Sequence, residues 1–254
     1  NVAGDLLLVA VFHLGAAGAA LATVFAQAIS VVLSLLVIAR RKLPFTFRKE
    51  QLRFDRPLTA GILRLGVPIA LQDVLVGVSF LVILAIVNSL GLLQSAGMGI
   101  AEKVCAFVML LPSAFSQSVS AFVAQNTGAG KPERAKKALR YSVAVSLSIS
   151  VFVFYFNFFH GDLLAGIFAN DRAVVLEAAD YLKAYAIDCL LTSFLFCFVG
   201  YFSGLGKTVF VMAQGILGAF GVRIPVSFFM SRLPNVRLFY IGLATPCSTV
   251  VQVL

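Results

Sequence analysis

The sequence predicts an all-α, polytopic membrane protein built as a bundle of about eight transmembrane helices. Of its 254 residues, 60% are hydrophobic and only 12% are charged, and the mean hydropathy is +0.98. An ordinary soluble chain carries about 25% charged residues, and a disordered chain is poor in apolar ones. The long apolar runs lack the period-2 alternation of barrel strands. Because lipid leaves backbone groups no water to bond, helices are expected.

Eight apolar windows predict the helices in chain order. Crossing a bilayer takes about 20 mostly apolar residues, and most windows reach that length once charges near their ends are allowed. The predicted helices span residues 1–12, 16–39, 64–89, 95–126, 133–159, 174–204, 207–231 and 238–254. The first resembles the closing half of a helix and the last is cut short, so we interpret the chain as part of a longer protein.

Two of these helices depend on particular residues. The helix over 207–231 reaches full length only if Arg223 is tolerated inside the membrane. Between the fourth and fifth helices, Gly128–Lys131 predicts a tight turn, with glycine at a helix C-cap and Pro132 opening the next helix. The same turn lacks the strand, the spacing and the Ser or Thr of a phosphate-binding loop. No nucleotide site is therefore indicated.

Two basic connections set the predicted orientation. Residues 40–64 carry eight basic side chains against two acidic ones, and residues 131–140 carry five against one. Because basic loops stay in the cytoplasm, segments 40–63 and 127–140 are expected there, in a multi-pass protein of a plasma or inner membrane. The net charge of +9 is then a topology signal, so no nucleic-acid partner is expected.

The opposite side of the membrane is predicted to be less basic. Segment 160–183 carries four acidic residues against two basic ones. Arg232 and Arg237 fall on the same side, and they do not follow the rule for basic loops.

Segment 40–63 is the longest predicted connection and marks a boundary between two helical bundles. Its basic residues are interleaved with apolar ones, so it is either a linker lying on anionic lipid headgroups or a regulatory site. We predict the last two helices of one bundle in residues 1–39. Residues 64–254 are predicted to form a second bundle of six helices, the last of them truncated.

A short internal sequence similarity indicates that the two predicted bundles are related. Leu21–Thr23 with Gln27 stands in the helix before the basic connection, and Leu243–Thr245 with Gln252 stands in the final helix. Parallel repeats joined by a long connector are common among transporters.

Ionisable residues inside the predicted helices are candidate functional groups. A charge at the centre of a membrane helix costs about 2.5–3.5 kcal/mol, so such residues face protein or water rather than lipid. The candidates are Asp5, Asp73, Glu102, Lys103, Asp188 and Arg223.

Asp5 stands four residues after Asn1, so the two side chains share one face of a helix. A buried carboxyl group with an amide neighbour is suited to exchange protons or to join a cation site of oxygen ligands. The alternative is a helix-terminal aspartate hydrogen-bonded at a water-facing end.

The other candidates leave two interpretations open. Glu102 and Lys103 point about 100° apart on their helix, so each finds a partner on another helix or lines an aqueous cavity. Asp188 is either a carboxylate facing a cavity or a structural partner for Arg223. Asp73, which follows Gln72, is expected to face the bundle.

Catalytic and metal-binding constellations are not found in the sequence. The four cysteines lack metal-ligand spacing and are expected to be buried free thiols: Cys105, Cys189, Cys197 and Cys247. His13 and His160 are isolated, and no nucleophile stands near a base. We therefore expect neither an enzyme, nor a metal site, nor a cofactor.

Four stretches, in order and at plausible spacing, resemble the multidrug and toxic compound extrusion (MATE) family of secondary antiporters. They are Asn1 and Asp5 with Gly15–Thr23, Gly66–Pro68 with Gln72, Gln125–Ala135, and Gly204–Thr208. The resemblance implies twelve helices in two six-helix lobes that open alternately to either side. This chain would hold helices five and six of the amino-terminal lobe and nearly all of the carboxy-terminal lobe, with segment 40–63 as the cytoplasmic linker between them.

The resemblance also implies a coupling site. Asn1, Asp5 and Thr23 match family positions that contribute to a proton or sodium site of the amino-terminal lobe. In the other lobe, some members carry an acidic residue where this sequence has Val76, and others carry one a turn or more beyond Asp188. This sequence has neither in place.

The function implied by the resemblance is antiport. A multidrug exporter of this family moves small amphipathic, often cationic organic compounds out of the cytoplasm in exchange for H⁺ or Na⁺. Gln72, Asp73, Asn88, Glu102 and Asp188 are candidates for lining the cavity or contacting substrate. Two alternatives remain: a flippase of lipid-linked precursors from the same superfamily, which would favour a cationic cavity, and a non-transporting membrane scaffold, which needs no buried ionisable groups.

Overall fold

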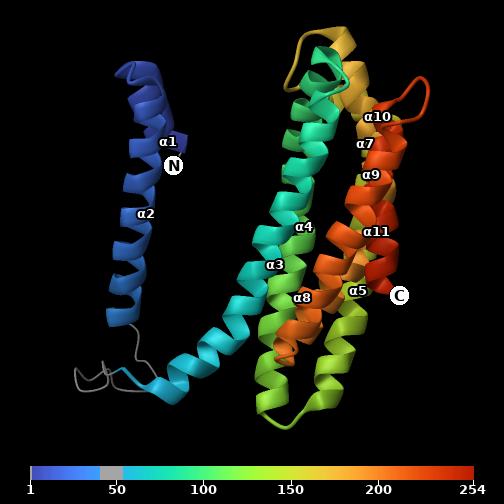
Figure 1. Cartoon of the computed structure of the whole chain (residues 1–254). Coiled ribbons are helices and arrows are strands. Elements are labelled where there is room, and N and C mark those ends of the chain that lie inside the picture. Colours follow the sequence, from blue (N-terminus) through green and yellow to red (C-terminus); the bar gives the residue numbers. More distant parts are fainter. Residues whose placement is uncertain (1, 41–53) are drawn as a thin grey trace. The chain divides into compact units, whose positions relative to one another are not determined.

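The computed structural model describes residues 2–40 and 54–254, and the elements in these ranges are helices without a strand (Figure 1). Six of these helices are long and apolar enough to cross a membrane. Two further apolar stretches, Val2–Val11 and Leu238–Val253, are shorter. The predicted all-α membrane bundle is confirmed, with the number of eight helices as an approximation.

Contacts divide the chain into two compact units, residues 1–55 and 56–254. The smaller unit contains α1 (Val2–Asp5), the π-helical segment η1 (Leu6–Val11) and α2 (Gly15–Arg40). The assignment of these units to two lobes of a twelve-helix protein stays a prediction.

The smaller unit is a helical hairpin closed by glycines. A Cβ atom added to Gly4 would lie 3.2 Å from the Cβ of Ala22, and one added to Gly18 would lie 2.9 Å from the carbonyl oxygen of Leu8. The absence of these side chains lets the backbones approach closely, as small residues do between membrane helices. Gly4 and Ala22 therefore fix the height at which α1 meets α2.

The larger unit contains long helices in its first two thirds and several shorter elements toward its end. Its elements are α3 (Arg56–Asn88), α4 (Leu92–Gly128), α5 (Pro132–Phe159), α6 (Gly161–Gly166), α7 (Arg172–Gly204), α8 (Thr208–Ile216), η3 (Leu217–Arg223), α9 (Ile224–Met230), α10 (Leu238–Gly242) and α11 (Ala244–Val253). The segments α8, η3 and α9 follow one another without a break and together form one span.

The structure differs from the predicted helices in three places. Helix α3 begins at Arg56, not at residue 64, because exposed charged residues near a helix end do not stop a helix and Pro57 fits its first turn. The predicted linker 40–63 is shorter for this reason, and its residues 41–53 lie outside the described part of the chain. Helix α6 was not predicted, and the last predicted helix is interrupted at Leu243.

Helix α7 occupies the centre of the larger unit. It packs against α4, α5, α6, α10 and α11 (Figure 1), and its buried residues lie on all sides of the helix. Gly200 allows close contact with α4, since a Cβ atom there would lie 2.4 Å from the backbone oxygen of Ser116. A helix enclosed by protein on all sides is one that can carry buried polar groups away from lipid.

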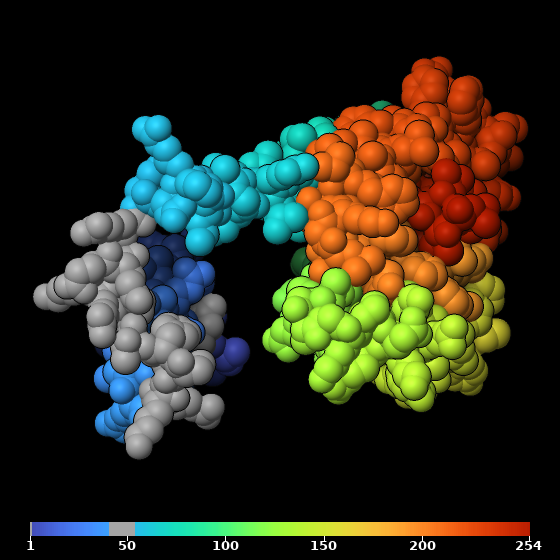
Figure 2. Space-filling view, turned by 90° about the horizontal axis from the view of Figure 1, so that it is seen from below, coloured from blue at the N-terminus to red at the C-terminus, as the bar shows by residue number. Residues whose placement is uncertain are grey.

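The outward faces of the larger unit are apolar. Leu81, Phe107 and Phe152 are among many large hydrophobic side chains that remain exposed in this unit. Figure 2 views the unit from the end that carries the α4–α5 turn, where yellow-green residues lie beside orange residues of α8. An apolar exterior of this extent is suited to lipid rather than to water.

Candidate functional site

Asp188 lies at the middle of α7 and has no exposed surface. The hydroxyl of Thr249, on α11, donates a hydrogen bond of 2.6 Å to its Oδ1 atom. The same hydroxyl lies 3.1 Å from the backbone oxygen of Thr245. The contact joins residues 61 positions apart and connects the central helix to the last one.

Arg223 is the second buried charge of the larger unit, and it is the last residue of η3. Only 6% of its surface is exposed. Its Nη1 atom donates to Ser79 Oγ at 3.3 Å, and its guanidinium carbon lies 4.5 Å from the ring centroid of Phe80. The guanidinium is thus held by a hydroxyl and an aromatic face of α3, a favourable arrangement for a desolvated cation.

A serine of α11 bonds to the backbone of the π-helical segment η3. Ser248 Oγ donates at 2.7 Å to the carbonyl oxygen of Gly218. In addition, Pro225 has no backbone N–H to donate to the preceding turn. Both features fit a local departure from α-helical bonding, and π-helical turns occur often at functional sites.

Asp188 and Arg223 are close enough to interact electrostatically, yet no ion pair joins them in the described part of the chain. Four buried polar atoms in this region lack a hydrogen-bond partner among the described residues: Asp188 Oδ2, Arg223 Nε, Tyr185 Oη and Ser227 Oγ. We call Ser79, Tyr185, Asp188, Arg223, Ser227 and Thr249 the buried polar cluster. Unpartnered buried groups are rare and require an explanation.

Asp5 and Thr23 stand on facing helices of the smaller unit. Each follows directly after one member of the Gly4–Ala22 contact between the two helices. Asp5 is half-buried within its unit and immediately precedes η1. Thr23 Oγ1 donates to the backbone oxygen of Ala19 at 3.0 Å. Asn1, the third predicted residue of this site, lies outside the described residues.

The candidates predicted to line a cavity are not gathered at one place. Gln72 packs its side chain against Gly215 of α8, whereas Asp73 is exposed. Asn88 accepts a 2.6 Å hydrogen bond from Ser95 Oγ near the α3–α4 turn. Glu102 is exposed in this unit. Among these residues only Asp188 is fully buried.

A cavity of about 260 Å³ lies among α7, α8 and α11 of the larger unit. It is lined by Leu195, Phe198, Val199, Phe202, Phe210, Val211, Gln214, Gln252, Val253 and Leu254. Apolar and aromatic walls with a few polar groups are typical of small-molecule sites. Of the sequence features singled out earlier, only Gln252 is part of this wall.

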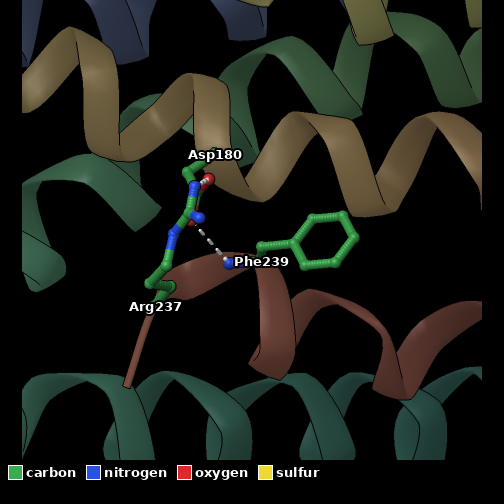
Figure 3. Close-up of polar contacts among 3 residues, drawn as sticks. All are labelled: Asp180, Arg237 and Phe239. Atoms are coloured by element: carbon green, nitrogen blue, oxygen red, sulfur yellow. Dashed lines mark hydrogen bonds and ion pairs between the residues drawn. The ribbon is translucent and has the colours of Figure 1, made fainter. Parts of the chain in front are cut away.

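A third carboxylate, that of Asp180, lies at the end of the larger unit that is opposite the α4–α5 turn. Figure 3 shows Asp180 of α7 paired with Arg237 and accepting a hydrogen bond of 3.1 Å from the backbone N–H of Phe239. Its carboxylate therefore caps the start of α10, where negative charge is favourable. Asp180 raises the pKa of the Arg237 guanidinium above its ordinary value through this hydrogen bond and its charge.

The Asp180 contact explains one exception in the predicted topology. Arg237 has a carboxylate partner on the same end of the unit, and Arg232 lies with its guanidinium carbon 4.9 Å from the ring centroid of Phe228. Both basic residues are thus satisfied locally. Sequence reasoning placed Asp180 only in an acidic stretch, and the 57-residue separation from Arg237 hid the contact.

The cysteines are free thiols, in agreement with the prediction. Cys189 and Cys197 are buried and Cys105 is half-buried, but Cys247 is exposed on the outer face of α11, which corrects the expectation of four buried thiols. The described residues contain no group of three or more His, Cys, Asp or Glu side chains placed to hold a metal ion.

Comparison with known families decides the relationship. The family model MatE matches residues 68–229, which is more than half of the chain. The chain belongs to the MATE family. It is thus a multi-pass membrane protein of this family, as the resemblance implied.

Relatives of this MATE chain carry names that refer to drug resistance. It is 24% identical over 244 residues to the probable multidrug resistance protein YoeA of Bacillus subtilis, covering 95% of this chain and 53% of that protein. It is 27% identical over 237 residues to the multidrug export protein MepA of Staphylococcus saprophyticus, covering 92% and 51%. The chain therefore spans about half the length of these curated relatives.

Solved structures share the fold. A crystal structure of MATE in complex with MaL6 superposes with a TM-score of 0.90 at 15% identity, covering 99% of this chain and 57% of that one. An outward-facing multidrug resistance MATE transporter gives a TM-score of 0.86 at 15% identity, covering 99% and 56%. At this level of identity the similarity establishes the fold.

Proposed function

We propose that the full-length protein is a secondary antiporter that exports small amphipathic, often cationic organic compounds in exchange for H⁺ or Na⁺. The membrane architecture and the family membership support transport, and the names of the relatives support drug export. The observation that carries ion coupling is the placement of Asp5. This half-buried carboxylate stands where an α-helical segment passes into a π-helical one, next to the close contact of Gly4 with Ala22.

Ion binding at Asp5 would act on the balance between two conformations of the transporter. A ligand shifts such a balance only by its differential affinity for the two states. Binding of a cation removes the net negative charge of Asp5, and the local helix geometry favours a different packing once the charge is gone. The membrane potential supplies about 2.3 kcal/mol per charge per 100 mV, which corresponds to roughly fiftyfold accumulation at equilibrium per coupled charge.

The cavity among α7, α8 and α11 offers a surface for substrate contact in the larger unit. Three phenylalanines supply a broad apolar surface: Phe198, Phe202 and Phe210. The amides of Gln214 and Gln252 provide orientation, and the Gln214 Oε1 atom is buried without a partner among the described residues. Such a lining accepts varied aromatic compounds, because apolar contact is not directional.

Efflux from cells that make the full-length protein tests this function. Cells are loaded with a fluorescent organic cation, and efflux is followed while the proton and the sodium gradients are collapsed separately. We expect export to stop when the gradient of the coupling ion is collapsed and to persist when the other gradient is collapsed. Export that continues with both gradients collapsed would contradict antiport, and no export of any organic cation would favour the flippase or the scaffold.

A further inference from the structure

The first turns of α5 carry exposed basic side chains that the proposed function does not use. Arg134, Lys137 and Arg140 are exposed, and none of them forms an ion pair within the part of the chain that the structure describes. The acidic residue of these turns, Glu133, is paired with Lys136 at 2.9 Å. Figure 2 views the larger unit from this end, where the yellow-green residues of the α4–α5 turn lie at the surface. The start of α5 therefore presents positive charge that no described acidic residue neutralises.

Packing on the rest of the unit determines which of these side chains face outward. Ala135 is buried in a small core between α4 and α5, and Ser146, three helical turns further along, is buried as well. Each residue advances an α-helix by about 100°, so Lys137 lies about 200° from Ala135, on the outer side. Arg134 lies within about 60° of Lys137 around the helix. Lys136 points about 100° away from Lys137 and is held by Glu133.

The outer face of α5 changes from basic to aromatic to apolar along the helix. Tyr141, one turn after Lys137, is 72% exposed, and Val145 and Phe152 on the same face are exposed as well. Tyrosine is suited to the boundary between headgroups and acyl chains. From Tyr141 to Phe152 the helix rises about 16 Å, close to half of the hydrocarbon thickness of about 30 Å. The face thus repeats the order of groups in one phospholipid.

The two outward basic residues are complementary to a phosphate. Side chains three positions apart on a helix have Cβ atoms about 5–6 Å apart, so Arg134 and Lys137 can reach the same group. The arginine fork donates two parallel hydrogen bonds to phosphate oxygens, and the lysine adds a compact charge. A headgroup with a choline cation would bring a like charge to this place, whereas an anionic headgroup would not.

We propose that the start of α5 is a binding site for one anionic phospholipid. Arg134 and Lys137 hold the headgroup phosphate, Tyr141 lies at the boundary of headgroup and acyl chains, and the chains run along Val145 and Phe152. The site uses neither the coupling ion nor a drug, so it is independent of the proposed function. A lipid bound there fixes the start of α5, and with it the α4–α5 turn, at one membrane surface.

Photocrosslinking of the full-length protein in phosphatidylcholine vesicles tests the site. The probe is a small fraction of phosphatidylglycerol with a photoreactive diazirine in its acyl chain, and labelled positions are mapped by mass spectrometry of peptides. Segment 141–152 should be labelled by this probe and much less by a phosphatidylcholine carrying the same diazirine. Inorganic phosphate added at constant ionic strength should not reduce the labelling, because the site takes a lipid and not a free anion.

Three single variants separate a site from diffuse surface charge. Lys137→Gln should lower the labelling about fivefold at a limiting amount of probe, the factor for one basic side chain at an anionic surface. Arg134→Gln, at the other outward position, should give a similar loss. Lys136→Gln is the matched control, since it removes the same charge from the same turn at a side chain held by Glu133, and it should keep the labelling of the wild type.

Three outcomes would overturn the proposal. Equal losses in Lys136→Gln and Lys137→Gln would mean that only the total charge of this surface matters. Equal labelling by the two lipid probes would mean that the headgroup charge is not recognised. Displacement of the probe by inorganic phosphate would mean that the basic residues bind a free anion.

Discussion

The two units differ in how deeply a carboxylate within a membrane helix is buried and in the charges near it. In the smaller unit, Asp5 is half-buried, and residues 2–39 contain no Lys or Arg. In the larger unit, Asp188 is fully buried and has Arg223 in the same core. Asp5 thus has no basic side chain within residues 2–39 of its own unit, whereas Asp188 shares its core with a guanidinium.

The units also share features that make the comparison direct. Each contains a π-helical segment, Leu6–Val11 or Leu217–Arg223, and an ionisable residue stands at one edge of it. Each also carries the sequence Leu-Ala-Thr after its π-helical segment, with Thr23 on α2 and Thr245 on α11. The same local elements therefore frame an acid in one unit and a base in the other.

The largest effect is expected from removing the acid of the smaller unit. Asp5→Asn in the full-length protein should abolish ion-driven efflux, because a neutral amide neither gains and loses a proton nor supplies the negative charge that balances a bound cation. Efflux of a fluorescent cation from energised cells measures this. Asp162→Asn, at an exposed acid at the start of α6, is the control and should export normally. Coupled transport at the wild-type rate in Asp5→Asn would remove Asp5 from the mechanism.

A large effect on stability is expected from removing the base of the larger unit. Arg223→Met leaves Asp188 buried without the charge that acts on it, and a buried charged group that loses its compensation costs about 1–3 kcal/mol or more, although no direct ion pair joins the two. Thermal unfolding of the purified protein gives the change. The double variant with Asp188→Asn should recover most of the loss, since neither charge remains. Additive losses in the double-mutant cycle would show that the two charges do not interact.

A smaller difference is expected between the two threonines. Thr249→Val removes the donor to a buried carboxylate and should cost about 1–3 kcal/mol, the range for a buried group left unsatisfied. Thr23→Val removes an exposed hydroxyl that also bonds to its own helix, and its cost should be the smaller of the two, because exposed substitutions change stability less than buried ones. Comparison of the two melting temperatures checks this. Equal losses would mean that the contrast in burial has no energetic consequence.

The smallest effect is expected at the third carboxylate. Asp180→Asn should weaken the hold on Arg237 and on the N–H of Phe239, so amide hydrogen exchange in segment 231–243 should be faster. Because the pKa of Arg237 is raised in the folded state, its contribution is complete below the ordinary arginine pKa and is lost only as the pH rises through the raised value. The protection factor of this segment, which is the measured exchange rate corrected for the intrinsic pH dependence of amide exchange, should therefore fall with added salt and stay constant with pH near neutrality.

The helices were predictable from the sequence, and most of their ends were as well. The predicted 133–159 and 174–204 correspond to Pro132–Phe159 and Arg172–Gly204. Apolar length and helix-ending glycines are local properties, so neighbouring residues suffice to read them. The early start of α3 was missed because exposed charges near a helix end were interpreted as part of a loop.

Parts of the candidate sites were predictable in a different sense. Charge cost alone singled out Asp5, Asp188 and Arg223, since few ionisable residues are found within apolar windows. The geometry around them was not predicted. Pro225 was a signal for irregular bonding near Arg223, but the sequence offered no sign that Ser79 and Phe80 would receive the guanidinium.

The sequence by itself determined that this chain lies in a membrane as helices, and where those helices run. It also determined which charges lipid would reject, because hydrophobicity and charge are properties of single residues. Only the tertiary structure decided which groups meet, since Arg223 reaches Ser79 across 144 residues and Asp188 reaches Thr249 across 61. Such pairings depend on how distant helices pack against one another, and no spacing along the chain encodes that packing.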